Sequence, residues 1–255
     1  MKIIFLGTNG WYSSPTGNTA CILIDSKTRY VVFDAGNGIY KLDKYITENK
    51  PISLFISHFH LDHVAGFHTL GKFKFKQGID VYVGEGRRND FDTLVHRPYT
   101  IGIEAEKENI YNLSTKVKLH QLSAGNHDIG FPVSVHKLFH AYEDHGYRVT
   151  LENKTIAYSG DTGICPESKV FAKNADLLIH ECSYTKHPDS KSWGHVTPEE
   201  AAQLAKDAHV KQLILTHFDP THYPTLDARS EAQKRAQKIF PNTTAAKDDL
   251  CVVLK

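Results

Sequence analysis

One short segment of this sequence concentrates residues that can bind metal ions. Residues 58–63 (HFHLDH) supply three imidazoles and one carboxylate, directly after an apolar run typical of a strand. In an extended loop His58 and His60 lie on one side, whereas Asp62 and His63 enter the next turn and can face a second point nearby. Imidazole with carboxylate suits zinc, and also manganese or iron. We predict two adjacent metal ions, because a surface cluster of His and Asp, the alternative, arises rarely at this spacing.

The HFHLDH segment resembles the HxHxDH signature of the metallo-β-lactamase superfamily. That resemblance implies an α/β fold, an αββα four-layer sandwich, with the metal site at one edge of two facing sheets. It also implies three further ligands downstream, which we look for at the ends of strands.

Three histidines compete for the first of these positions. His140 follows a predicted strand and lies six residues before Gly146-Tyr147-Arg148, like the third histidine of the ribonuclease Z branch of the superfamily. His136 and His145 lack this combination, so we expect them in the core or behind the ligands. His140 is therefore the predicted ligand.

The two remaining ligands follow two later strands. Asp161 lies in a Gly-Asp-Thr turn that resembles the turn of the family's bridging aspartate, where glycine lets the backbone approach the metals closely. The alternative is an aspartate that only stabilises the turn and binds no metal. His217 lies in a Thr-His-Phe sequence that resembles the family's final motif, and we expect the nearby His222 to be peripheral.

The resemblance implies a pair of metal ions, expected to be two Zn²⁺ with Mn²⁺ or Fe²⁺ as alternatives. The first ion takes His58, His60, His140 and Asp161, and the second takes Asp62, His63, Asp161 and His217. Such ions, about 3.5–4 Å apart, lower the pKa of bound water and clamp the attacking and departing oxygens of an in-line displacement.

Two further motifs bear on the reaction. Residues 180–183 (HECS) and 193–197 (WGHVT) resemble the HEAT and GHST motifs of ribonuclease Z. In that branch the histidine, here His195, donates a proton to the departing alkoxide, and the glutamate, here Glu181, orients it. A phosphodiester gains from such an imidazolium, and a thioester or lactone needs it less. We expect Asp62, His195 and Glu181 to be catalytic; the alternatives are a helix-flanking histidine and a structural carboxylate.

Strands and helices must position these residues, and the sequence predicts both. Short β-branched and apolar runs bounded by turn residues predict strands. They lie at Ile3–Leu6, Ala20–Ile24, Tyr30–Phe33, Ile52–Ile56, Val117–Leu122, Val133–Phe139, Tyr147–Leu151, Thr155–Ser159, Leu177–His180, Gln212–Thr216 and Leu250–Leu254. This mixture with helices indicates α/β layers.

The clearest predicted helix begins after Thr197, with Pro198 at its first position and Glu200 completing a capping box. A second helix is predicted over Leu226–Phe240, and the segment Gly84–Ile110 is expected to carry a helix and a loop. No linker or repeat divides the chain, so we predict a single domain over residues 1–255.

Composition narrows the classes of function. Lys and Arg total 30 and Asp and Glu total 29, so a net charge of +1 gives no global field for a polyanion. No apolar run approaches the roughly 18 residues of a membrane span. The N-terminal apolar stretch is too short for a secretory signal, and the four scattered cysteines form no CxxC pair. We therefore expect a cytoplasmic protein without a membrane partner.

The resemblance to ribonuclease Z covers nearly the whole chain but has departures. Phe33-Asp34-Ala35-Gly36 looks like its FDxG turn, in which we expect Asp34 to be structural. Gly17 stands where the branch usually carries an arginine, and only the 20 residues 141–160 separate His140 from Asp161. That length leaves no room for the protruding arm with which bacterial-type enzymes grip tRNA, which weighs against tRNA 3′ processing.

One further segment of the chain is a candidate for contacts with RNA. Residues 72–76 (KFKFK) alternate lysine with aromatic rings, which could follow a phosphate backbone and stack bases. An edge strand protected by lysines is the favoured alternative. Trp193, beside His195, either stacks on a substrate base or caps its loop.

We therefore expect a ribonuclease Z-like phosphodiesterase, in which metal-bound hydroxide attacks phosphorus and His195 protonates the leaving oxygen. The expected substrate is a phosphodiester: an RNA 3′ region, a cyclic nucleotide or a smaller diester. The resemblance alone suggests a homodimer. A glyoxalase II-like thioesterase or lactonase is the alternative reaction class, and a binding module without activity is the alternative outside enzymes, although all seven candidate ligands are present.

Overall fold

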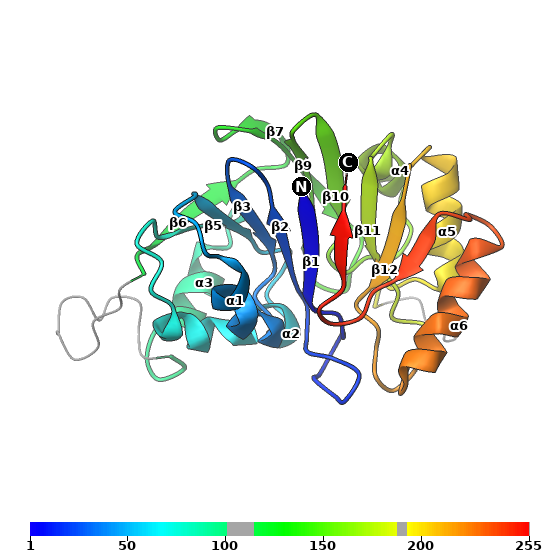
Figure 1. Cartoon of the computed structure of the whole chain (residues 1–255), viewed down its shortest axis with the longest axis horizontal. Helices are drawn as coiled ribbons and strands as arrows, with labels where there is room; N and C mark the ends of the chain where they lie inside the picture. The colour runs from blue at the N-terminus through cyan, green and yellow to red at the C-terminus, as the bar shows by residue number, and fades with distance from the viewer. Residues whose placement is uncertain (101–114, 188–192, 255) are drawn as a thin grey trace.

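Two β-sheets stacked face to face form the centre of the molecule (Figure 1). This computed structural model describes residues 1–100, 115–187 and 193–254, and within them each sheet has seven strands. The first sheet has the order β14 (Cys251–Val253), β1 (Lys2–Gly7), β2 (Cys21–Asp25), β3 (Tyr30–Phe33), β4 (Ile52–Phe55), β5 (Ile79–Gly84), β6 (Val117–Leu122). The second has the order β13 (Thr243–Ala245), β12 (Leu213–Thr216), β11 (Leu177–Glu181), β10 (Lys154–Tyr158), β9 (Asp144–Leu151), β8 (Pro132–Leu138), β7 (Gly125–Asp128).

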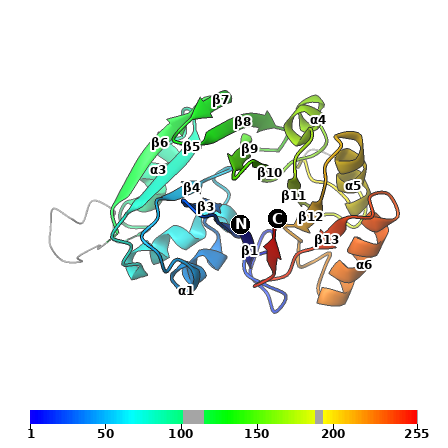
Figure 2. The same ribbon diagram turned by 45° about the horizontal axis from the view of Figure 1, so that its top comes forward.

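Helices cover the outer face of each sheet (Figure 2). The first sheet is covered by the 3₁₀ helices η1 (Asn37–Lys41) and η2 (Ala65–Lys72) and by α1 (Leu42–Tyr45), α2 (Leu61–Val64) and α3 (Arg88–Val95). The second is covered by α4 (Pro166–Ala172), α5 (Pro198–Asp207) and α6 (Leu226–Gln237). The four layers confirm the predicted αββα sandwich.

Alternation along the strands divides the apolar side chains between layers. In β1, Ile3 and Phe5 belong to the core between the two sheets, whereas Ile4 and Leu6 face the helices of the first layer. In the second sheet, Ile179 of β11 faces the inner core and Leu178 faces the outer helices. Both faces of these strands are buried, which explains their nearly continuous apolar sequences.

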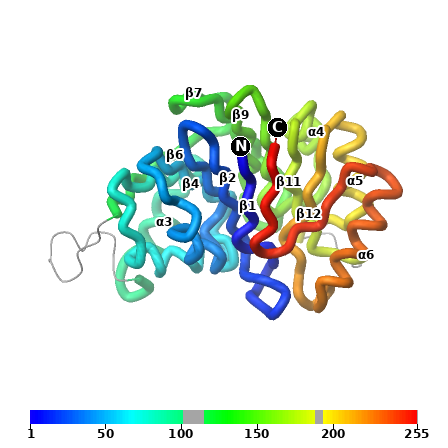
Figure 3. The backbone as a smooth tube through the Cα atoms, viewed as in Figure 1, coloured from blue at the N-terminus to red at the C-terminus, as the bar shows by residue number. Residues whose placement is uncertain are grey.

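The two ends of the described chain lie side by side. Strand β14 pairs antiparallel with β1, with Ile3 opposite Val252. Figure 3 shows the N- and C-terminal strands next to each other in the first sheet. Among the described residues, no helix combines the length and the apolar character that crossing a bilayer requires.

Each of the eleven predicted strands is present, with ends shifted by at most three residues. The predicted capping box is also confirmed: Thr197 Oγ1 accepts a hydrogen bond from the Glu200 N–H at 3.4 Å, and the Glu200 carboxylate accepts one from the Thr197 N–H at 3.0 Å. Helix α6 ends at Gln237, three residues before the predicted Phe240. Helix α3 lies within the segment Gly84–Ile110, part of which is outside the described residues.

Three strands were missed, and the structure contradicts both base stacking by the aromatic rings of residues 72–76 and an edge strand there. Strands β7 and β13 are short edge segments defined by pairing with β8 and β12, and β5 lies inside the first sheet. Lys72 ends η2, and the rings of Phe73 and Phe75 are buried and stacked at 5.0 Å between centroids. These rings belong to the core, so they cannot stack bases, and the segment is not an edge strand.

Candidate metal centre

The predicted ligands come together where strands of both sheets end at the same edge. His58 and His60 follow β4, and the loops after β8, β10 and β12 carry His140, Asp161 and His217. Helix α2 begins at Leu61, so its single turn directs Asp62 and His63 toward the same region. The structure therefore brings all seven predicted ligands into two adjoining groups.

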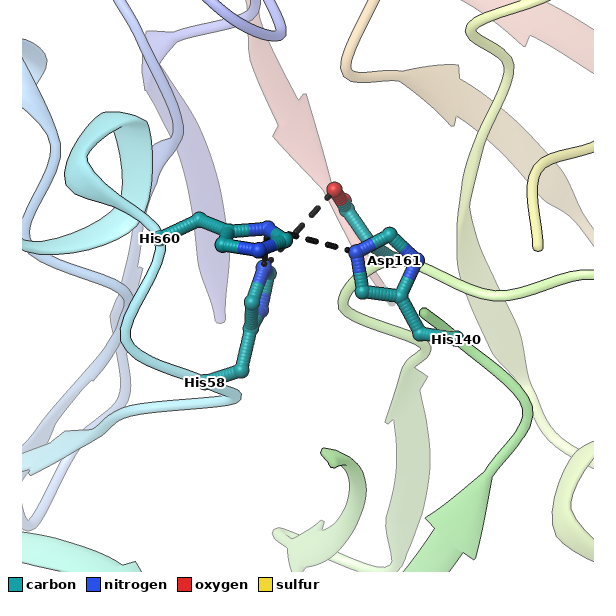
Figure 4. A group of neighbouring side chains, drawn as sticks. All are labelled: His58, His60, His140 and Asp161. Atoms are coloured by element: carbon teal, nitrogen blue, oxygen red, sulfur yellow. Dashed lines mark hydrogen bonds and ion pairs between the residues drawn. The ribbon is translucent and has the colours of Figure 1, made fainter. Parts of the chain in front are cut away.

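The first group consists of His58, His60, His140 and Asp161, whose ligand atoms all lie within 4.8 Å of one another. Figure 4 shows the four side chains pointing toward a common centre from different loops. His60 Nδ1 lies 3.0 Å from His58 Nε2 and 3.3 Å from His140 Nε2. His58 Nε2 is 3.9 Å from Asp161 Oδ2.

The second group consists of Asp62, His63, Asp161 and His217. The Nε2 atoms of His63 and His217 lie 3.0 Å apart, and they are 3.3 Å and 3.2 Å from Asp161 Oδ1. His217 Nε2 is also 3.1 Å from Asp62 Oδ2. Asp161 thus presents one carboxylate oxygen to each group, as a bridging ligand would.

These distances fit a pair of tetrahedral metal sites. Ligand atoms about 2.05 Å from a zinc ion in a tetrahedral arrangement are about 3.3 Å from one another. The separations given above lie between 3.0 and 3.9 Å, and all ligand atoms within a group are within 4.8 Å of one another. Within the described part of the chain, Asp161 Oδ1 is also a buried atom without a hydrogen-bond partner, which a cation would satisfy.

Four of the five candidate ligand histidines have their second ring nitrogen held from behind. His58 Nδ1 lies 3.1 Å from Asp144 Oδ1, His63 Nδ1 2.7 Å from Asp34 Oδ2, His140 Nδ1 3.3 Å from the Gly194 carbonyl oxygen and His217 Nδ1 3.0 Å from Ser183 Oγ. Such contacts fix the tautomer and ring orientation of a metal-binding histidine. Nε2 of each of these four rings is therefore available to a metal, whereas His60 turns its Nδ1 toward the first group.

Burial sets the charge of the first group. It lowers the pKa of both His58 and His140 to about 4, with a further contribution to His58 from His63. Both imidazoles are neutral at pH 7, which is the form that binds a metal. In the second group, burial lowers the pKa of His63 and His217, but the surrounding carboxylates, Asp161 foremost and Asp62 beside it, together outweigh burial and raise both pKa values. Without a cation this group attracts protons, as a site with excess carboxylate does.

Two buried carboxylates behind the ligands were not predicted to contact them. Asp34, expected to be structural, also holds His63 and accepts a hydrogen bond from the Tyr158 hydroxyl at 2.5 Å. Asp144 opens β9, contacts His58, and accepts a hydrogen bond from the Asp161 N–H at 3.2 Å. Burial raises the pKa of Asp144, and the neighbouring Asp161 and Asp34 raise it further. Asp144 lies three residues before the predicted strand Tyr147–Leu151, and β9 extends back to include it, so the sequence prediction gave no signal for its role.

Gly160 is required by this close packing. Its φ of +59° lies in the left-handed region, and a Cβ there would be 2.4 Å from Asp144 Oδ1. This agrees with the expectation that the glycine permits close approach of the backbone at Asp161.

His195 and Glu181 form a pair beside both groups. His195 Nδ1 lies 2.7 Å from Glu181 Oε1, and the two residues lie with His217 in a third cluster of potential ligand atoms. Glu181 is fully buried and accepts hydrogen bonds from the N–H groups of Thr162 at 3.2 Å and Ser183 at 2.9 Å. Burial lowers the pKa of His195, but the Glu181 carboxylate outweighs it and raises the pKa to about 9.

The other histidines considered from the sequence lie outside the two groups. His136 contacts Glu167 at 2.6 Å on the outer side of β8, and His145 is buried. His222 contacts the Ser183 carbonyl oxygen at 2.9 Å. Trp193 is 57% exposed, and its carbonyl oxygen accepts a hydrogen bond from the Ala141 N–H.

Comparisons with known proteins identify the family. The family model described as Beta-lactamase superfamily domain matches residues 29–218. The probable metallo-hydrolase YhfI of Bacillus subtilis is 28% identical over 245 residues, covering 94% of each chain. A ribonuclease Z of Enterococcus faecalis is 30% identical over 301 residues, covering 97% of this chain and 96% of the relative. The crystal structure of the metallo-beta-lactamase fold protein YhfI from Bacillus subtilis has a TM-score of 0.80 at 24% identity, covering 98% of both chains. The chain therefore belongs to the metallo-β-lactamase superfamily, as a metal-dependent hydrolase that resembles ribonuclease Z.

Proposed function

We propose that the protein is a dinuclear zinc-dependent phosphodiesterase whose substrate is an RNA 3′ region, a cyclic nucleotide or a smaller diester. The observation that carries this proposal is the pair formed by buried Glu181 and partly buried His195 beside the two ligand groups. The similarity to ribonuclease Z supports it independently.

Under this proposal His58, His60, His140 and Asp161 hold one zinc ion, and Asp62, His63, Asp161 and His217 hold the other. When bound, such ions lower the pKa of a water molecule and stabilise negative charge on the phosphoryl oxygens. Asp161 supplies an oxygen to each group, and Asp34 and Asp144 orient His63 and His58 from behind.

His195 acts as the general acid. Its Nδ1–H donates to Glu181 Oε1, so Nε2 carries the proton that can be released to a leaving oxygen. In the metal-free protein the Glu181 carboxylate, against the effect of burial, raises the pKa of His195 to about 9 and so favours the protonated imidazole. Glu181 is kept in position by two backbone N–H groups, and its charge stabilises the imidazolium.

A proton donor in this position favours a phosphodiester over a thioester. An alkoxide leaving group is strongly basic and needs a proton as its bond to phosphorus breaks, whereas a thiolate leaves more readily unprotonated. The Glu181–His195 pair therefore matches the chemistry of a phosphodiester with a poor leaving group.

We further propose that the chain acts as a single domain in the cytoplasm. All four cysteines are free, and two of them are buried, as a reducing compartment allows. The alignment with the ribonuclease Z runs over 301 positions although this chain has 255 residues, so that relative carries segments absent here. We also propose a homodimer on the basis of the resemblance to ribonuclease Z.

The test is hydrolysis of aryl phosphodiesters by protein reconstituted with zinc or manganese. Bis(4-nitrophenyl) phosphate, with a good leaving group, and diphenyl phosphate, with a poorer one, are compared in the wild type, His195→Ala and Glu181→Gln. His222→Ala, which removes a histidine outside both groups, is the control. We expect both site variants to retain two metal ions and His195→Ala to lose about 10²–10⁴-fold in kcat on diphenyl phosphate.

The loss in His195→Ala should be smaller with the nitrophenyl ester, because that leaving group needs less protonation. Equal activity of His195→Ala and the wild type on diphenyl phosphate would show that His195 is not the general acid. Metal-loaded protein that hydrolyses thioesters or lactones but neither diester would overturn the phosphodiesterase assignment.

A further inference from the structure

The loop between β1 and β2 packs directly on the candidate metal ligands. The backbone N–H of Trp11 donates to Asp62 Oδ2 at 2.7 Å. Gly10 lies so close to His217 that a Cβ there would be 2.5 Å from its Cε1 atom. The main chain of this loop therefore forms part of the wall around the second ligand group, and the Trp11 side chain begins at that wall.

Trp11 has a conformation that its own side chain does not favour. Its φ is +61°, in the left-handed region that bulky residues rarely adopt, and its side chain is 68% exposed. Neither local backbone preference nor burial of the indole therefore explains this arrangement. An unfavourable conformation that the surrounding structure maintains at a site is grounds for inferring a role there.

A buried arginine maintains the loop. Arg229 of α6 is 2% exposed and donates to Asn9 Oδ1, to Thr8 Oγ1 at 2.8 Å and to Thr16 Oγ1 at 3.0 Å. Asn9 Nδ2 in turn donates to the Tyr12 carbonyl oxygen at 3.1 Å. These bonds hold the backbone on both sides of Trp11, so the fold sets the point from which the indole projects.

Exposed aromatic rings lie on both sides of the ligand groups. Tyr12 meets Trp11 edge to face, with 5.3 Å between ring centroids. On the other side, Tyr142 is 42% exposed, and its ring centroid lies 6.1 Å from that of His60. The nearby positive charge of Arg87 is neutralised, since its guanidinium donates to Glu143 as well as to the Tyr142 hydroxyl. Among the described residues, this part of the site therefore presents exposed aromatic rings, and the positive charge of Arg87 is already paired.

We propose that Trp11 is a substrate-binding residue that stacks on a planar aromatic ring, a nucleobase or an aryl group, carried by one ester group of a compact phosphodiester. This inference rests on the proposed phosphodiesterase function and specifies its substrate class. A ring stacked on the indole places the phosphorus near Asp62 and His217, because the Trp11 backbone is bonded to one and the adjacent Gly10 touches the other.

The first test measures inhibition constants of three monoester product analogues against diester hydrolysis. Adenosine 5′-monophosphate and phenyl phosphate carry a ring, and methyl phosphate does not, so their comparison isolates the ring and distinguishes nucleobase from aryl. Stacking of one ring predicts that a ring-bearing monoester binds wild type about 5- to 150-fold tighter than methyl phosphate. Trp11→Ala should abolish this advantage and leave methyl phosphate within about twofold, whereas Trp11→Phe should keep most of it.

Tyr40→Ala is the matched control, because Tyr40 is also an exposed aromatic residue but contacts Lys72. It should leave all three inhibition constants unchanged. A Trp11→Ala protein that retains the wild-type preference for adenosine 5′-monophosphate over methyl phosphate would overturn the inference, with diester hydrolysis and hence the proposed function intact.

The second test does not depend on turnover. The chain has two tryptophans, so Trp193→Phe leaves Trp11 as the only indole. Stacking predicts saturable quenching of its fluorescence by adenosine 5′-monophosphate or phenyl phosphate and none by methyl phosphate. Absence of quenching by both ring-bearing compounds would refute the role of Trp11, even for a protein that hydrolyses no diester.

Discussion

Asp34→Asn tests whether a buried carboxylate behind a ligand controls metal binding. The Asp34 carboxylate is fully buried and accepts four hydrogen bonds: from Ser57 N–H at 2.8 Å, Ser57 Oγ at 2.9 Å, Tyr158 Oη at 2.5 Å and His63 Nδ1 at 2.7 Å. Asparagine tolerates the φ of +59° at this position, so the backbone is retained. The change removes the negative charge and turns one acceptor oxygen into a donor.

The magnitude follows from the bond to His63. Whichever way the amide turns, its NH₂ group faces at least one of the four donors, and His63 loses a charged partner. Loss of such a contact behind a metal ligand typically lowers metal affinity 10- to 100-fold, or about 1.4–2.7 kcal/mol. We expect this loss at the second ligand group only, because the first group does not include His63.

Zinc titration of metal-free protein in competition with a chromogenic chelator measures both affinities. Asp176→Asn is the control, because Asp176 accepts hydrogen bonds from Thr155 N–H and Lys211 Nζ, away from the ligand groups. It should bind two zinc ions like the wild type. A folded Asp34→Asn protein with both affinities unchanged would show that His63 needs no carboxylate behind it, and would refute the reasoning.

Two further predictions concern the acid pair and the core. In metal-free protein we expect His195 to titrate near pH 9 in NMR spectra, and we expect Glu181→Gln to lower that pKa. Because folding raises the pKa of His195, the pair stabilises the folded state fully below about pH 6.5. This contribution to stability disappears as the pH rises through 9. An unchanged His195 pKa in Glu181→Gln would contradict this. Phe171→Ala removes a fully buried ring between the second sheet and its helices. It should lower the free energy of unfolding, measured by urea titration, by about 3–5 kcal/mol. A loss below about 1 kcal/mol would mean that neighbouring side chains move to fill the cavity.

The grouping of the seven candidate ligands was predictable because their sequence signals are local. Four of them lie within residues 58–63, and His140, Asp161 and His217 each follow a recognisable strand. Strands that run in the same direction end at the same edge of a sheet, so ligands placed after different strands converge without any knowledge of the distances between them.

The residues behind the ligands were not predictable in the same way. Asp144 reaches His58 only because β9 lies between β8 and β10 and so faces the end of β4 across the sandwich. Residues 72–76 show the opposite failure: their alternation has the period of a strand, but Phe73 and Phe75 are buried beneath the first layer of helices. In both cases long-range packing decides, and sequence periodicity does not record it.

The candidate ligands follow core strands, whereas the proposed substrate-binding residue lies on a loop. Residues that would bind metal and residues that would bind substrate are therefore positioned by different parts of the fold. The ligands follow strands whose two faces are buried, whereas Trp11 and Tyr142 lie on loops, where a change in sequence alters the surroundings of the site without moving the ligands. Between His140 and Asp161 the chain forms only the β9–β10 hairpin, closed by Glu152 and Asn153 with φ of +51° and +59°. A two-residue turn of this kind leaves no protruding arm for a large RNA. Without that arm, we expect the proposed phosphodiester to be held by contacts close to the candidate ligands, and Trp11, whose backbone N–H is bonded to Asp62, is placed to supply one.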